Sequence, residues 1–411
     1  MLEFQIRTVL RFYQRKAKHY FEDVCSPGVW EDLKAAIIEE ERIFIQDLQQ
    51  IHNINTQAEH SLKMADCNKA LIDIQHFIRD LAEDIHKLIA EKEKECLQLF
   101  RLTESSKDVT YEWYKDRVEN RVENTCKWVL HHEYFRAWLD AETGPLLISA
   151  DPGCGKSVLS KYLVDQFFPE NRSTESATVC YFFFKGGDQN SIRQALCALL
   201  HQLFSQKRHL VKHAMEQYDK DGKGIIHSTS SLWKVFAQAV QDERAGPMIM
   251  VLDAMDECLE TECQDLLDRI GIMFRDRFPH RSSKSGQGQL KILLTSRPYD
   301  EVVDKFHAVN DWLPYVRIPG EECSDIISEE INKVIRVRVE QLASVQQLRP
   351  NVKEALQDKL LAIQHRTYLW VHLVFDYLEN SSLKKTPKGV VEAMKHLPKN
   401  VNEAYDRILS R

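Results

Sequence analysis

The segment from residue 146 to residue 157 constrains the fold of this chain more than any other. An apolar run ends at Ala150, a turn with two glycines follows, and Lys156 and Ser157 open an amphipathic stretch. A buried strand, a glycine-rich turn and a helix in this order form a cradle of backbone N–H groups for phosphate. The sequence therefore predicts a phosphate-binding loop, with a nucleoside triphosphate as its ligand.

Each position of this predicted loop has a role. The turn places its N–H groups around the phosphates, Lys156 is set to reach the β- and γ-phosphates, and Ser157 offers its hydroxyl to Mg²⁺. The motif has glycine at position 150, so the Cβ of Ala150 is expected to strain or slightly reshape the turn. The predicted nucleotide-binding residues are Asp151, Pro152, Gly153, Cys154, Gly155, Lys156, Ser157 and Val158.

A second apolar run, at residues 248–252, ends in Asp253. Ligands of parallel sheets bind at the carboxyl ends of the strands, so we expect Asp253 beside the loop, where it would hold Mg²⁺. Asp256 and Glu257 follow closely and are candidates to orient or deprotonate an attacking water. The alternative interpretation is an acid-rich helix start, which the helix dipole favours.

A third run, Lys291 followed by the apolar residues 292–294, delivers Thr295, Ser296 and Arg297 to the same edge. An arginine there contacts the γ-phosphate and stabilises charge in the transition state. The alternative is a surface arginine that merely ends a strand. The Asn-Lys-x-Asp motif that reads guanine is missing from the sequence, which favours adenine. The predicted ligands are therefore ATP or ADP with Mg²⁺.

Apolar runs alternate with helical patterns from about residue 110 to about residue 320. Such runs indicate a parallel sheet covered on both faces, so we predict a P-loop three-layer α/β sandwich with a five-stranded sheet. Helical spacing of apolar residues predicts an all-α bundle before it and a helical subdomain after it. The strands are expected at 145–150, 177–184, 248–253, 291–296 and 315–318, and the domains at 1–105, 106–320 and 321–411.

Composition narrows the function classes. A net charge of −7 argues against a chain that coats nucleic acid or an acidic membrane. No apolar run reaches the about 18 residues that a membrane span requires, and basic residues interrupt the first helix where a signal peptide would be apolar. The ten cysteines include no C-x-x-C pair, which indicates reduced thiols. We therefore expect a cytoplasmic protein without nucleic-acid partners.

With its three strand-end motifs in place, the chain resembles the NACHT class of signal-transducing P-loop ATPases, especially fungal NOD-like receptors and nephrocystin-like proteins. The resemblance covers roughly residues 108–411. Besides the three motifs, it rests on residues 113–118, 125–128, 138–139, 368–374 and 404–409.

This resemblance implies a molecular switch. ADP holds a closed state, exchange for ATP opens it and drives homo-oligomerisation, and hydrolysis is slow. Lys156, Ser157, Asp253 and Arg297 match family positions and take the roles given above. The implied setting is innate immunity or programmed cell death in fungi, with protein partners bound through the N-terminal helices.

The chain also departs from this family. Asn124, near the expected adenine site, stands where relatives often have glycine, and His365 and Arg366 stand where Asp-Gly is common. Relatives continue into a winged helix and repeats, so we expect either a short protein or a fragment of a longer one.

Two other function classes stay open. A nucleic-acid remodelling ATPase would need a basic tract, and the acidic balance speaks against it. A non-catalytic scaffold with a degenerate ATPase domain finds its best support in Ala150.

Overall fold

A computed structural model gives the fold of the chain. It describes residues 61–101, 110–277 except 172 and 175, 289–298, 315–318 and 324–380 except 364 and 365, with a few positions between 39 and 47. Of the all-α bundle expected before the sheet, residues 1–60 lie outside the described residues apart from those few positions.

The chain divides into two compact units. The first comprises Met1–Leu102 and Phe204–Ala239, and the second comprises Thr103–Leu203 and Val240–Arg411. The predicted domain limits at residues 105 and 320 stay a prediction, but the sequence did not suggest that Phe204–Ala239 belongs with the N-terminal segment.

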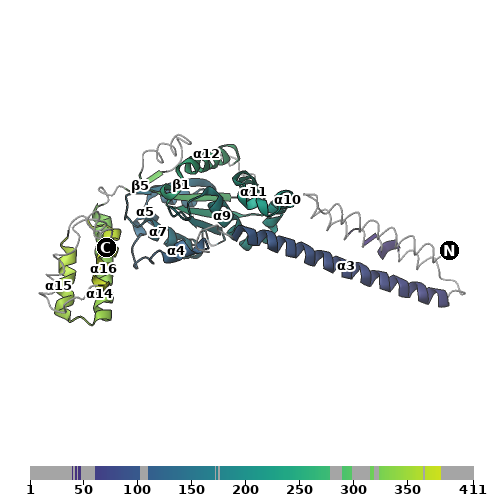
Figure 1. Ribbon diagram of the computed structural model, residues 1–411, viewed down its shortest axis with the longest axis horizontal. Helices are drawn as coiled ribbons and strands as arrows, with labels where there is room; N and C mark the ends of the chain where they lie inside the picture. Colours follow the sequence, from purple (N-terminus) through teal and green to yellow (C-terminus); the bar gives the residue numbers. More distant parts are fainter. Residues whose placement is uncertain are drawn as a thin grey trace. The chain divides into compact units, whose positions relative to one another are not determined.

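The first unit is built on one long helix, α3 (Ser61–Arg101), seen in Figure 1. Its last turns bury Cys96 and Phe100, and the Phe100 ring meets Phe204 edge-on with centroids 5.8 Å apart. The helix therefore extends to Arg101, within the helical region that the sequence predicted up to residue 105. The shorter helices described in this unit are η2 (Arg208–Val211), α10 (Lys212–Asp221), η3 (Gly222–His227) and most of α11 (Thr229–Gln241).

The second unit holds a sheet whose strands are all parallel and follow the order β2-β3-β4-β1-β5. The predicted parallel α/β sheet is therefore confirmed, and each strand end falls within two residues of its expected position. The strands are β1 (Gly144–Ala150), β2 (Thr178–Phe183), β3 (Pro247–Asp253), β4 (Gln289–Ser296) and β5 (Tyr315–Ile318).

Strand order determines which helices share a face. The step from β1 to β2 crosses the sheet in one direction, and the steps from β2 to β3 and from β3 to β4 return in the other. Because such crossovers are right-handed, α7 lies on one face, and α9 and α12 lie on the opposite face. The helices around the sheet are α4 (Glu112–Arg117), α5 (Lys127–His131), α6 (Glu133–Asp140), α7 (Lys156–Tyr162), α9 (Ile192–Gln206) and α12 (Glu260–Arg277).

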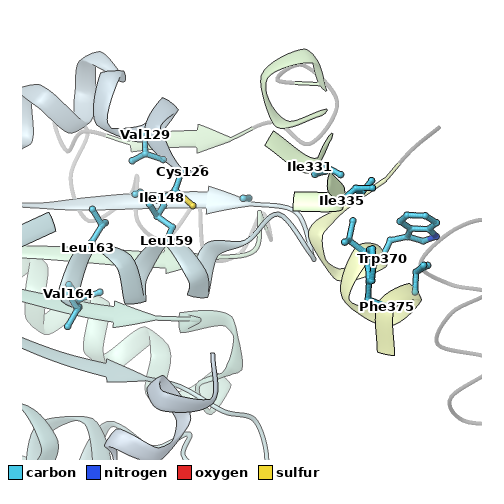
Figure 2. Close-up of a cluster of buried hydrophobic side chains, with 14 of the residues drawn as sticks. Cys126, Val129, Ile148, Leu159, Leu163, Val164, Ile331, Ile335, Trp370 and Phe375 are labelled. Atoms are coloured by element: carbon cyan, nitrogen blue, oxygen red, sulfur yellow. The ribbon is translucent and has the colours of Figure 1, made fainter. Parts of the chain in front are cut away.

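In the described residues after the sheet, α14 (Ser324–Gln346) packs against both α15 (Pro350–Leu361) and α16 (Tyr368–Asn380), as Figure 1 shows. Each buries an apolar stripe at helical spacing, which is why the sequence after residue 322 forms helices rather than strands. Figure 2 shows Ile331, Ile335, Trp370 and Phe375 gathered on α14 and α16, and Ile148, Leu159 and Leu163 gathered around β1 and α7.

Candidate functional site

The turn between β1 and α7 has the backbone conformation that a phosphate loop requires. Gly153 and Gly155 have φ of 81° and 80°, a left-handed region in which a Cβ is strained. Gly155 caps α7, whose first residues are Lys156 and Ser157. A π-helical segment (Leu163–Phe167) and α8 (Phe168–Glu170) then extend the helical run. Among the other predicted loop residues, Pro152 is exposed, and Asp151, Cys154 and Val158 are partly buried.

Ala150 does not strain the turn, contrary to the expectation from the motif. It is the last residue of β1, fully buried, with the extended backbone of a strand. The left-handed positions of the turn begin only at Gly153. A methyl group at position 150 therefore packs in the core and costs the loop nothing.

Lys156 reaches back across the loop. Its Nζ donates to the carbonyl of Ala150 at 2.6 Å and to that of Asp151 at 3.1 Å. Burial lowers the pKa of Lys156, while the carboxylates of Asp256 and Asp253 act in the opposite direction. Backbone carbonyls thus hold the Lys156 ammonium at the loop, where the carboxylates of Asp256 and Asp253 are close enough to stabilise its charge.

Asp253 ends β3 with its side chain 1% exposed. Its Oδ1 accepts from Ser160 Oγ and from Thr295 Oγ1, each at 2.7 Å, and the Ser157 hydroxyl also bonds to this carboxyl. Burial raises the pKa of Asp253, and the three hydroxyls oppose that rise. The structure therefore brings the predicted metal-side pair, Ser157 and Asp253, together.

Hard oxygen donors of this kind suit Mg²⁺, which proteins commonly bind through one or two carboxylates together with substrate phosphates. Asp253 and Ser157 supply a carboxylate and a hydroxyl at the start of α7, so the residues present fit this ion. Sequence reasoning missed Ser160, although its position three residues after Ser157 places both hydroxyls on one face of the helix.

The two acids after β3 have different partners. Asp256 accepts from the Arg297 backbone N–H at 2.9 Å and from its Nε at 3.0 Å. Glu257 Oε2 accepts from the Gly186 N–H at 2.8 Å and from Lys185 Nζ at 3.1 Å. The loop after β2 thus holds Glu257, a partnership for which the sequence offered no signal.

Asn124, one of the departures noted in the sequence, has φ of 65°. Asparagine is among the few non-glycine residues that visit this left-handed region routinely, so it serves where relatives have glycine. Its Oδ1 also accepts from Lys127 Nζ at 2.6 Å. Of the second departure, His365 lies outside the described residues, and Arg366 Nη1 donates to the Leu360 carbonyl at 3.4 Å.

A phosphate loop after the first strand, a buried aspartate at the end of the third and an arginine at the end of the fourth define a P-loop NTPase. Three domain families match segments of the chain. Residues 124–297 match the N-terminal domain of nephrocystin 3, residues 1–68 the N-terminal domain of NWD NACHT-NTPase, and residues 327–397 a domain of unknown function (DUF7069). The chain is therefore a NACHT-type P-loop NTPase with nephrocystin 3-like and NWD-type N-terminal domains.

It is also a distant homologue of the vegetative incompatibility protein HET-E-1 of the fungus Podospora anserina. The two are 26% identical over 330 residues, which cover 78% of this chain and 22% of HET-E-1. The chain thus spans about a fifth of that relative's length.

Similar solved structures include the ADP form of Aeropyrum pernix ORC2, with a TM-score of 0.42 and 13% identity, covering 69% of this chain and 72% of that one. Caenorhabditis elegans PCH-2 has a TM-score of 0.35 and 12% identity, with 78% and 69% covered. In the described part of the chain, no helix is both long and apolar enough to cross a membrane.

Proposed function

We propose that this chain is a nucleotide-operated signalling switch that binds ADP and ATP with Mg²⁺ and hydrolyses ATP slowly. The buried carboxyl of Asp253 supports this most directly, because Ser157 and Ser160 hold it against α7 beside Lys156. A desolvated acid at the metal side of a phosphate loop serves no evident packing purpose.

In this proposal the N–H groups of the turn bind the phosphates, and Lys156 exchanges its carbonyl acceptors for phosphate oxygens. Ser157 and Asp253 would hold Mg²⁺, which would offset phosphate charge. Glu257 orients and deprotonates the attacking water, and Arg297 stabilises charge near the γ-phosphate. Asp256 orients Arg297 through their double contact.

A switch requires that ADP and ATP bind its two states with different free energies. The start of α16 contacts the phosphate loop, so the C-terminal helices are placed to respond to the nucleotide. We propose that ATP opens this arrangement and leads to self-association, with partners bound through the N-terminal helices. We propose a role in innate immunity or programmed cell death in fungi, in the cytoplasm, as the family resemblance implies. The similarity to a vegetative incompatibility protein of a fungus supports the fungal setting.

The scaffold alternative loses its main support, because Ala150 lies unstrained in β1 and does not degrade the loop.

Fluorescent ADP titration tests the proposal. The full chain should bind mant-ADP, Lys156→Ala should abolish binding, and Lys161→Ala should leave it intact. Lys161 is the matched control because it lies on the same helix and donates to the Val118 carbonyl at 2.6 Å, away from the loop. Equal binding by wild type and Lys156→Ala would disprove the assignment. Light scattering with an ATP analogue should then show a larger assembly than with ADP.

A further inference from the structure

The first residues of α16 lie directly on the turn of the phosphate loop. A Cβ added at Gly153 would stand 2.8 Å from Leu369 Cβ, and one at Gly155 would stand 3.2 Å from the Tyr368 ring. The Leu369 N–H also donates to the Gly153 carbonyl at 3.4 Å. The two left-handed glycines are therefore covered by one helix start.

A buried carboxylate fixes the Tyr368 ring in this place. The Tyr368 hydroxyl donates to Glu330 Oε2 at 2.8 Å, and the same oxygen accepts from the Cys126 N–H at 2.9 Å. Glu330 is 4% exposed. Cys126 holds a φ of 63°, a costly conformation that presents its N–H to this acceptor.

The two hydrogen bonds to Glu330 are stronger than ordinary ones. Hydrogen bonds to a carboxylate are stronger than those between neutral groups, and a buried acceptor that loses its donor is left desolvated without a partner, which is destabilising. Burial, together with the nearby Glu330, raises the pKa of Tyr368, so its hydroxyl keeps the proton that it donates. The ring therefore has one orientation over Gly155.

A loop that binds an anion through N–H groups gains affinity when these groups are already arranged. We propose that Tyr368 and Glu330 are positioning residues for the phosphate loop: Glu330 fixes the Tyr368 ring, and the ring and Leu369 hold the turn in its binding conformation. Packing of α14 and α16 against the loop and binding of nucleotide to the loop are then linked, because each favours the other. This inference rests on the proposed nucleotide-binding function.

Tyr368→Phe in the full chain removes the hydroxyl and keeps the ring. We expect mant-ADP affinity to fall at least about tenfold, in keeping with the loss of a hydrogen bond to a charged acceptor. Amide exchange at residues 153–157 should accelerate without nucleotide. Tyr377→Phe, the same change further along α16, should alter neither quantity. Glu330→Gln should lower mant-ADP affinity to a similar extent. The double variant should bind mant-ADP no less tightly than the single variant with the lower affinity.

If Tyr368→Phe has the same mant-ADP affinity and amide exchange as the wild type, the inference is overturned. An equal loss of affinity in Tyr377→Phe would also overturn it, because the effect would then be merely structural. If the wild type binds no mant-ADP, the proposed function fails. Amide exchange alone then decides whether Tyr368 positions the loop: faster exchange in Tyr368→Phe supports it, and unchanged exchange overturns it.

Discussion

Arg297 donates to Asp256 twice, from its backbone N–H and from its Nε. The Asp256 side chain is 3% exposed, whereas that of Arg297 is 38% exposed. This double contact joins the end of β4 to the turn after β3. Because both oxygens of Asp256 bond to Arg297, we infer that Glu257 is the better candidate to accept a proton from water.

The Asp256–Arg297 pair should behave as a unit. Asp256→Asn and Arg297→Gln should each lower the free energy of unfolding, and the double variant should lose less than their sum, with a coupling of about 1 kcal/mol. We place it at the low end for contacting residues because solvent screens the exposed side of Arg297. Chemical denaturation of the four proteins measures it, and losses that add within about 0.3 kcal/mol would show that the pair is not coupled.

Glu257→Gln should separate binding from hydrolysis. The amide keeps an acceptor for the Gly186 N–H but cannot take a proton, so ATP hydrolysis should fall at least about 100-fold with mant-ADP affinity unchanged. Phosphate release measures the rate. Glu260→Gln, an exposed acid in the first turn of α12, is the control and should hydrolyse normally. A wild-type rate in Glu257→Gln would remove Glu257 from the mechanism.

Much of the sheet edge followed from local sequence. Uninterrupted apolar runs mark the buried strands, and parallel strands end at a common edge, so Asp253 and Arg297 were expected near Lys156. The phosphate loop was equally predictable, because its glycines meet a backbone need that the short motif itself records.

Contacts between distant segments could not be predicted in this way. Cys126 and Glu330 are 204 positions apart, and no periodicity relates them. The pairing of Asp256 with Arg297 depends on the turn after β3, in which Ala254 takes a φ of 57° that its sequence does not announce. Lys185 and Gly186 reach Glu257 from a loop whose path only the folded chain defines.

The ion pair of His372 with Glu119 should make stability depend on pH. His372 Nδ1 lies 2.9 Å from Glu119 Oε1, and this bond raises the pKa of His372 above 6.5 and lowers that of Glu119 below 4.5. The histidine contribution is therefore complete below about pH 6.5 and is lost as pH rises through the raised pKa. The carboxylate contribution is complete above about pH 4.5 and is lost as pH falls through the lowered pKa.

Chemical denaturation of wild type and His372→Gln at pH 6 and pH 8.5 tests this dependence. Both side chains are 51% exposed, so the difference at pH 6 should stay below about 1 kcal/mol and should vanish at pH 8.5. The neighbouring charges of Arg338 and Asp376 are unchanged in the variant. His131→Gln, on α5, should leave the pH profile unaltered, and a difference that persists at pH 8.5 would exclude the ion pair as its cause.

Gly153→Ala should damage the loop in two ways. A φ of 81° costs an alanine about 1 kcal/mol or more, and its Cβ would stand 2.8 Å from Leu369 Cβ. Overpacking of this kind typically costs about 1–3 kcal/mol. We expect the free energy of unfolding to fall by about 2 kcal/mol or more and mant-ADP affinity to fall with it. If Gly153→Ala changed neither the free energy of unfolding nor the affinity, α16 would not be in close contact with the turn.

Ala150→Gly restores the glycine of the general motif and should bring no benefit. Position 150 lies in β1 with extended backbone and no exposed surface, so glycine gains no needed conformation and loses a buried methyl group. Glycine in place of alanine inside a strand is destabilising by about 0.5–1 kcal/mol, and the free energy of unfolding should fall by about this much. Affinity for mant-ADP should stay within about twofold of wild type, which corresponds to well under the about 1.4 kcal/mol of a tenfold change. A large gain in affinity would instead mean that the Ala150 methyl group obstructs the nucleotide, and the scaffold interpretation would regain its support.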